Sequence, residues 1–228
     1  MRVRLRTAVH TFLTAGAIVC LGLLPMVTQA TLLSTEQPST PYEVVTISGD
    51  PTHARTYLGV LQDTPLMYEI TAEQPFTLTA RLQQPAWDRR EPDHYSLIII
   101  RQNDRGGGVS EVARLYGDET QWRPVRDRVV GLTFFQATLS ASVGPGVYRI
   151  EVSTPENQGR YRLQLGTESD GVGYFARLGQ IATTQDFFGY SPVKLLTSSY
   201  VYYPLGVLLL LVGLHMVWRH RQASRTAE

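Results

Sequence analysis

The sequence contains a single cysteine, Cys20, which lies in an apolar segment near the N-terminus. The rest of the chain has no thiol, so a disulfide, a cysteine zinc site and a cysteine nucleophile are excluded there. An exported domain without disulfides depends on its hydrophobic core. About 165 residues are enough to build one.

The sequence also lacks a large charge imbalance, with 21 basic and 20 acidic side chains and a net charge of +1. This excludes a protein that coats nucleic acid, whose basic excess would be large. The charges are unevenly placed: arginines without acids in residues 1–30, an acidic excess in 31–199, and three arginines with one glutamate in 200–228. Each basic end adjoins an apolar run, which argues against a simple cytosolic enzyme.

Catalytic motifs are absent as well. The sequence has no GxSxG, no HExxH and no phosphate-binding glycine loop. His53 and His94 are the two histidines of the middle region, and neither lies in a nucleophile or zinc motif. We therefore predict that the protein is not an enzyme and that it carries no cofactor and no metal.

The N-terminal segment has the three-part layout of a secretory signal peptide. Arg2, Arg4 and Arg6 precede an apolar run from Phe12 to Leu24, and Thr28-Gln29-Ala30 supplies a small-x-small cleavage site. The pattern predicts a signal peptide over residues 1–30, followed by a linker over 31–42. An uncleaved anchor is the alternative.

The C-terminal segment contains a second apolar run. Residues 200–218 include no formal charge and, as a helix, would span roughly 28 Å, about one hydrocarbon core. Aromatic side chains lie at both ends and arginines follow at once, so the positive-inside rule predicts a single-pass helix in the cytoplasmic membrane with residues 219–228 in the cytoplasm. The predicted interface residues are Tyr200, Tyr202, Tyr203, Trp218, Arg219 and Arg221.

Between these ends, residues 43–168 show short alternating runs separated by turn residues. In residues 76–82 the apolar side chains fall at every second position, as they do in residues 148–152 and 161–165. The pattern is typical of a mainly β, antiparallel sandwich or barrel. The predicted strands are 43–48, 56–62, 66–71, 76–83, 94–102, 111–116, 133–141, 146–153 and 160–166, with residues 97–100 expected to be packed on both faces.

The segment GPGVYRIEVSTPENQGRYRLQLG, residues 144–166, carries a resemblance to a known family. Its Gly-Pro-Gly turn, two Tyr-led strands and intervening polar turn resemble the last hairpin of bacterial pre-peptidase C-terminal domains. Residues 47–51 and 75–82 are similar to the opening strands of that family. The resemblance implies a jelly-roll-like β-sandwich on an exported protein, here without an attached peptidase, and it carries over no catalytic residue.

Residues 169–199 form a juxtamembrane segment, in which the pattern becomes helical between residues 171 and 189. Tyr174, Leu178, Ile181 and Phe188 share one face of a predicted amphipathic helix. This helix lies either on the membrane surface or on the sandwich, and the small number of cations favours the sandwich.

Two surface segments are candidate ligand or partner sites. Trp87, Asp88, Glu91 and Asp93 lie close together in the sequence. Three carboxylates can hold Ca²⁺, although Arg89 and Arg90 oppose this, and a solvated loop that contacts a partner is the simpler interpretation. A second patch includes Arg123 and Arg126, which suit an anionic glycan or peptide, or surface salt bridges.

The sequence thus predicts a membrane-anchored, exported β-sandwich that acts as a protein-interaction or structural module of the cell envelope. Its expected partners are the lipid bilayer and another membrane or envelope protein, and no nucleic acid. The alternative function is a carbohydrate- or calcium-binding adhesin-like domain.

Overall fold

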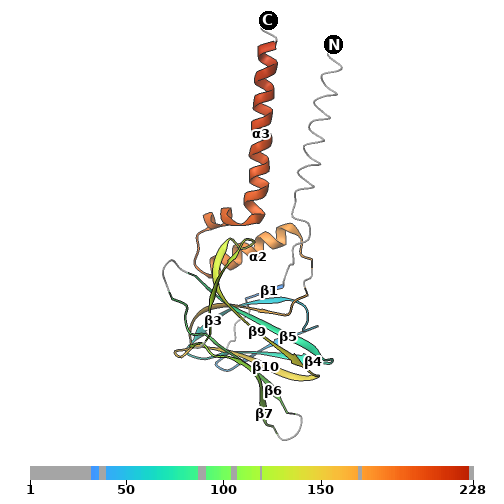
Figure 1. Ribbon diagram of the computed structural model, residues 1–228, viewed down its shortest axis with the longest axis vertical. Helices are drawn as coiled ribbons and strands as arrows, with labels where there is room; N and C mark the ends of the chain where they lie inside the picture. Colours follow the sequence, from blue (N-terminus) through green and yellow to red (C-terminus); the bar gives the residue numbers. More distant parts are fainter. Residues whose placement is uncertain are drawn as a thin grey trace.

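The structure is a computed structural model that describes residues 32–35, 40–86, 91–103, 107–118, 120–168 and 171–225. The predicted signal peptide over residues 1–30 lies outside these residues. The described part forms a two-layer β-sandwich, with one long helix rising from one end of it (Figure 1).

The larger layer is a six-stranded sheet, in which almost all neighbouring strands are antiparallel. The exception is β1, which pairs with β3 in parallel at the sheet edge. In spatial order its strands are β1 (Leu32–Ser34), β3 (Arg55–Gln62), β11 (Gln158–Leu165), β5 (Phe76–Pro85), β9 (Leu132–Val143) and β8 (Arg123–Asp127).

The smaller layer has five strands and one parallel pair, β2 with β4, again at an edge. Both sheets are therefore mixed, while their interiors are antiparallel as predicted. Their order is β2 (Val44–Ile47), β4 (Leu66–Ala72), β10 (Gly146–Ser153), β6 (Ser96–Gln102) and β7 (Val109–Leu115).

The core lies between the two sheets and is formed by the positions that the period-two pattern assigns to one face. Along β5, Leu78, Ala80 and Leu82 are fully buried, whereas Thr77 and Arg81 point outward. Tyr68 and Tyr161 meet inside the core, where their hydroxyls are 2.9 Å apart and satisfy one another. The alternation of side chains therefore explains which face of each strand is buried.

All nine predicted strands are present, with ends shifted by a few residues, and two further strands were not predicted. β1 lies within the expected linker over residues 31–42 and has only three residues. β8 has the sequence RPVRD, which is polar, contains a proline and is mostly exposed, so it lacks the signal of a half-buried strand. In β6, Leu97 and Ile99 face the core, while Ile98 and Ile100 are only partly buried on the outer face.

The amphipathic helix is α2 (Tyr174–Phe187), and it lies against the outer face of the six-stranded sheet. Phe188, just beyond its last residue, packs with Leu58, Leu132 and Phe134 of that face, and its ring is 5.6 Å from the ring of Phe134. Of the two locations considered from the sequence, the structure thus places this segment on the sandwich.

A short 3-10 helix, η1 (Pro192–Thr197), connects α2 to the long helix α3 (Ser199–Arg225). Both α2 and η1 lie at the N-terminal end of α3, which extends away from the sandwich (Figure 1). Residues 199–220 of α3 form a helix long and apolar enough to cross a membrane, with a mean hydropathy of 1.8. No residue of its most apolar stretch is buried inside the protein.

Candidate functional site: the junction between the sandwich and the apolar helix

The turn between β8 and β9, residues 128–131, connects the sandwich to the start of α3. The Ser198 hydroxyl donates a hydrogen bond to the carbonyl oxygen of Val129 at 2.5 Å. The Ser199 amide donates to the carbonyl oxygen of Arg128 at 2.9 Å. On the turn side, both contacts are made by backbone carbonyl oxygens.

The same turn is held by η1 and α2. The Thr197 hydroxyl donates to the carbonyl oxygen of Gly131 at 2.9 Å, and the Gln185 amide donates to that of Val130 at 2.6 Å. Gln185 also donates to the carbonyl oxygen of Lys194 at 3.2 Å, so one buried side chain joins α2, the turn and η1.

A close approach at Gly131 makes this packing possible. Gly131 has a φ of +75°, and a Cβ atom there would lie 2.5 Å from the Thr197 hydroxyl oxygen and 2.8 Å from the Ser198 nitrogen. Glycine is therefore required for two reasons, the left-handed backbone and the contact with the chain that leads into α3.

A second contact joins α2 to the first turn of α3. The Tyr174 hydroxyl donates to the carbonyl oxygen of Tyr200 at 2.6 Å, and the two rings stack with their centroids 5.5 Å apart. Tyr200, predicted as a membrane-interface residue, is buried and stacks on Tyr174 of α2. The base of α3 is thus held by two elements, the β8–β9 turn and α2.

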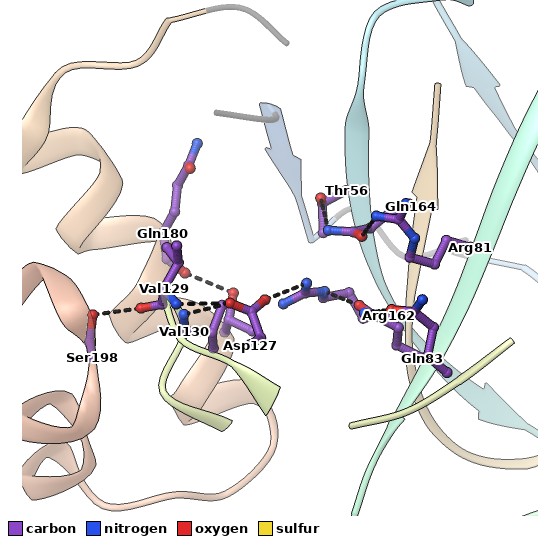
Figure 2. Close-up of polar contacts among 12 residues, drawn as sticks. Thr56, Arg81, Gln83, Asp127, Val129, Val130, Arg162, Gln164, Gln180 and Ser198 are labelled. Carbon is purple, nitrogen blue, oxygen red and sulfur yellow. Dashed lines mark hydrogen bonds and ion pairs between the residues drawn. The ribbon is translucent and has the colours of Figure 1, made fainter. Parts of the chain in front are cut away.

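Beneath the turn lies an ion pair between Asp127 of β8 and Arg162 of β11. An Arg162 guanidinium nitrogen is 2.8 Å from an Asp127 carboxylate oxygen, and the two side chains are 5% and 19% exposed. The other carboxylate oxygen accepts the amides of Val129 and Val130, each at 3.0 Å. Asp127 therefore joins the turn to the centre of the sheet (Figure 2).

The environment of Asp127 favours its ionised form. Burial acts to raise the pKa of this carboxyl, but the charge of Arg162, the Val130 amide and the Arg162 hydrogen bond together lower the pKa below its usual value. The carboxylate is therefore charged at neutral pH, and the pair is a true salt bridge.

Arg162 is part of a polar row across neighbouring strands (Figure 2). Its Nε donates to the Gln83 side-chain oxygen at 2.6 Å, and the Gln83 amide donates to Gln136 at 2.7 Å. The guanidinium also lies over the ring of Phe134, 4.7 Å from its centroid. The row thus links the buried Arg162 and Gln83 to Asp127 and Gln136.

An open cleft of about 790 Å³ lies between this row and α2. Polar groups from the sheet line one side, and α2 contributes Arg177, Gln180 and Thr184 to the other. The hydrogen bonds and the ion pair of the row hold the turn on the sheet, and α2 forms the other side of the cleft.

Sequence reasoning missed this site, although one signal pointed to it. Arg162 lies between the core residues Tyr161 and Leu163 of β11, and this alternation places it on the outward face of the strand, which normally means exposure. However, Tyr57 and Leu58 are consecutive apolar residues, and Phe134 is followed by Phe135, so the outer face of this sheet is also apolar. Such a face requires cover, and the amphipathic α2 provides it.

The first predicted ligand segment is only partly described. Trp87 and Asp88 lie outside the described residues, whereas Glu91 and Asp93 line an open cleft of about 780 Å³ with His94. The backbone of Asp93 is held by Gln84, which accepts from its amide at 2.7 Å and donates to its carbonyl oxygen at 2.8 Å. Within the described part of the chain, no group of three or more His, Cys, Asp or Glu side chains is placed to hold a metal ion.

The second predicted patch is divided by the structure. Arg123 lines a cleft of about 710 Å³ with Arg114 and Tyr116, and Arg114 is paired with Glu111. Arg126 instead lies near the other end of β8, beside the β8–β9 turn, where its guanidinium donates to the Thr133 hydroxyl at 3.4 Å. The two arginines therefore belong to different surfaces.

The remaining predicted interface residues lie along α3. Tyr202 and Tyr203 are exposed with their rings 4.4 Å apart, and Trp218 is exposed near the other end beside His215. Arg219 is exposed one residue later, and Arg221 lies on α3, whose helix extends through residue 225. The spacing of the aromatic residues matches the length of the apolar stretch.

No protein family model matches the chain, and no curated protein matches it. Among solved structures, the chain is similar to the pre-peptidase C-terminal domain of a collagenase from Bacillus anthracis, at 14% identity and a TM-score of 0.34. The match covers 57% of this chain and 98% of that chain. The sandwich is defined by its own strand pairing.

Proposed function

We propose that the protein is a single-pass membrane protein whose exported β-sandwich acts as a protein-interaction or structural module of the cell envelope. The observation that carries the proposal is the junction. Backbone and side-chain hydrogen bonds from Ser198 and Ser199 to the β8–β9 turn fix the sandwich on the base of α3. A domain held in this way presents its other surfaces in a constant orientation.

The topology follows from the charges that flank the apolar helix. Arg219, Arg221 and Arg225 follow it directly, and the positive-inside rule assigns this end to the cytoplasm. A periplasmic-type reporter enzyme fused after residue 228 is expected to be inactive, whereas the same reporter fused after residue 168 is expected to be active. The opposite pair of results would contradict the orientation.

The surface around Arg123 and Tyr116 is our proposed contact for a partner protein. Both residues are exposed and line one open cleft, on a part of the sandwich that takes no part in the junction. An anionic segment of the partner would complement Arg123 there.

Photocrosslinking in intact cells tests this role. A photoreactive phenylalanine analogue in place of Tyr116 is expected to yield one discrete adduct, which Arg123→Glu abolishes. The same analogue in place of Tyr42, which is exposed at a different place, serves as the control. No discrete adduct at Tyr116, or one that is unaffected by Arg123→Glu, would contradict the proposed contact.

A further inference from the structure

Exposed apolar side chains gather at the end of the domain from which α3 emerges. Phe175 of α2 is 84% exposed, and Val193 and Leu196 of η1 are 70% and 53% exposed. Phe175 is beside Tyr174, which contacts Tyr200 in the first turn of α3. All three apolar side chains thus lie next to the first residues of the apolar span.

Three cations accompany these apolar side chains. The carbonyl oxygen of Arg128 accepts a hydrogen bond from the amide of Ser199, so Arg128 lies beside the first residue of α3. Arg126 lies two residues earlier, where its guanidinium donates to the Thr133 hydroxyl at 3.4 Å. Lys194, the only lysine of the sequence, lies between Val193 and Leu195, with its ammonium nitrogen 5.4 Å from the centroid of the Tyr190 ring.

The acidic residue nearest to these arginines in the sequence does not neutralise them. Asp127 lies between Arg126 and Arg128, but its carboxylate points inward to Arg162 and the turn amides. Both arginines keep their guanidinium groups at the surface. Asp127 is therefore engaged by Arg162 and does not offset the charges of Arg126 and Arg128.

We infer that Arg126, Arg128, Phe175, Val193, Lys194 and Leu196 form a lipid-binding platform that seats the sandwich on anionic headgroups of the bilayer crossed by α3. The inference rests on the proposed membrane anchor. The bilayer is the occupant because η1 leads into the span through a single residue, Ser198, and α2 and η1 run across the foot of α3 (Figure 1).

The chemistry of the platform fits a membrane interface. Apolar side chains enter the boundary between headgroups and acyl chains, and cations beside them attract lipid phosphates. Because the β8–β9 turn fixes Arg128 against α3, the arginines need no rearrangement to reach the headgroups. The bilayer and the junction would then both restrict the tilt of the sandwich.

The test uses the chain purified from membranes, with Cys20→Ser and a single labelling site, Ser191→Cys, at the start of η1. An environment-sensitive fluorophore at residue 191 is compared in nanodiscs of phosphatidylcholine alone and of phosphatidylcholine mixed with phosphatidylglycerol, each with a headgroup-depth nitroxide quencher. The matched label is Val109→Cys, on an exposed position of β7 at the opposite end of the sandwich.

We expect quenching at residue 191 but not at residue 109, with stronger quenching when phosphatidylglycerol is present and weaker quenching at high salt. Arg128→Glu is expected to weaken binding of the platform to the anionic nanodiscs, read as quenching at residue 191, by about fivefold or more. This is the effect of one cation at such a surface. Arg101→Glu, an equal charge reversal on β6, is expected to change nothing. Val193→Ser with Leu196→Ser is expected to reduce quenching in both compositions.

Absence of quenching at residue 191, equal quenching in the two compositions, or equal effects of Arg128→Glu and Arg101→Glu would overturn the platform. Alkaline carbonate extraction of cell membranes separates this failure from failure of the anchor. A chain that stays with the membrane but is not quenched refutes the platform alone. A chain that carbonate releases refutes the anchor and the platform with it.

Discussion

The hydroxyl of Ser198, the residue before the apolar helix, donates a hydrogen bond to the carbonyl oxygen of Val129, which lies 69 positions earlier in the chain. Ser198 is fully buried, so its hydroxyl depends on this partner rather than on water. Ser198→Ala is expected to cost about 1–3 kcal/mol of local stability. Hydrogen exchange of residues 128–131 is expected to become faster, with Ser199→Ala as the adjacent control. Equal exchange in both variants would show that the hydroxyl is not needed.

The turn at Gly131 provides a second test of the junction. Gly131→Ala places a Cβ against Thr197 and Ser198, whereas Gly107→Ala has the same sign of φ but meets nothing within 4 Å. Both variants pay the backbone cost of a left-handed alanine, about 1–2 kcal/mol. Only Gly131→Ala is expected to lose a further 1–3 kcal/mol or so and to accelerate hydrogen exchange in η1. Equal destabilisation of the two would contradict the close packing.

The Asp127–Arg162 pair predicts a specific dependence on pH. Its surroundings lower the pKa of Asp127, so its contribution is present above the pKa of an unfolded aspartate, about 3.9, and is lost as the pH falls through the lower folded value. Asp127→Asn is expected to cost about 2–3 kcal/mol at neutral pH, and this difference shrinks below about pH 4.

Urea unfolding of the detergent-solubilised chain at several pH values measures this effect. The control is Glu69→Gln, which breaks the more exposed pair with Arg149 and is expected to cost less than about 1 kcal/mol. A cost for Asp127→Asn that does not change with pH would show that charge is not the cause.

The cover that α2 provides predicts a contrast between two phenylalanines. Phe188 is buried against Leu58, Leu132 and Phe134, so Phe188→Ala is expected to destabilise the domain by about 3–4 kcal/mol. Phe175, on α2 itself, is exposed, and Phe175→Ala is expected to change the unfolding free energy by no more than about 0.5 kcal/mol. Thermal unfolding in detergent separates these cases, and similar effects would contradict the position of α2.

Alkaline pH is expected to unfold the sandwich through its buried tyrosine pair. Burial raises the pKa of both Tyr68 and Tyr161. In the unfolded chain tyrosine ionises near pH 10, so the folded state loses stability as the pH rises above about 10. The phenolate absorbance is expected to rise together with unfolding, and Tyr68→Phe with Tyr161→Phe delays this rise. Tyr42→Phe is the exposed control, and an equal delay there would refute the role of the pair.

Much of the fold was predictable because local patterns encode it. Alternation along residues 76–82 and 161–165 identifies the core positions Leu78, Leu82 and Leu163, which the structure buries completely. β8 was not predictable, because its exposed RPVRD sequence has no period-two signal and its pairing with β9 defines it as a strand. The platform residues Arg126 and Arg128 depend on that strand for their position.

The sequence by itself determined the mainly β architecture, the amphipathic helix and the long apolar helix, because each follows from the spacing of apolar side chains. Only the tertiary structure decided that Asp127 meets Arg162 and that Ser198 meets Val129, contacts that join residues 35 and 69 positions apart. The physical reason is that periodicity specifies which face of an element is apolar or outward. It does not specify which distant segment covers that face, and it is this cover that buries Arg162 and fixes the sandwich on α3.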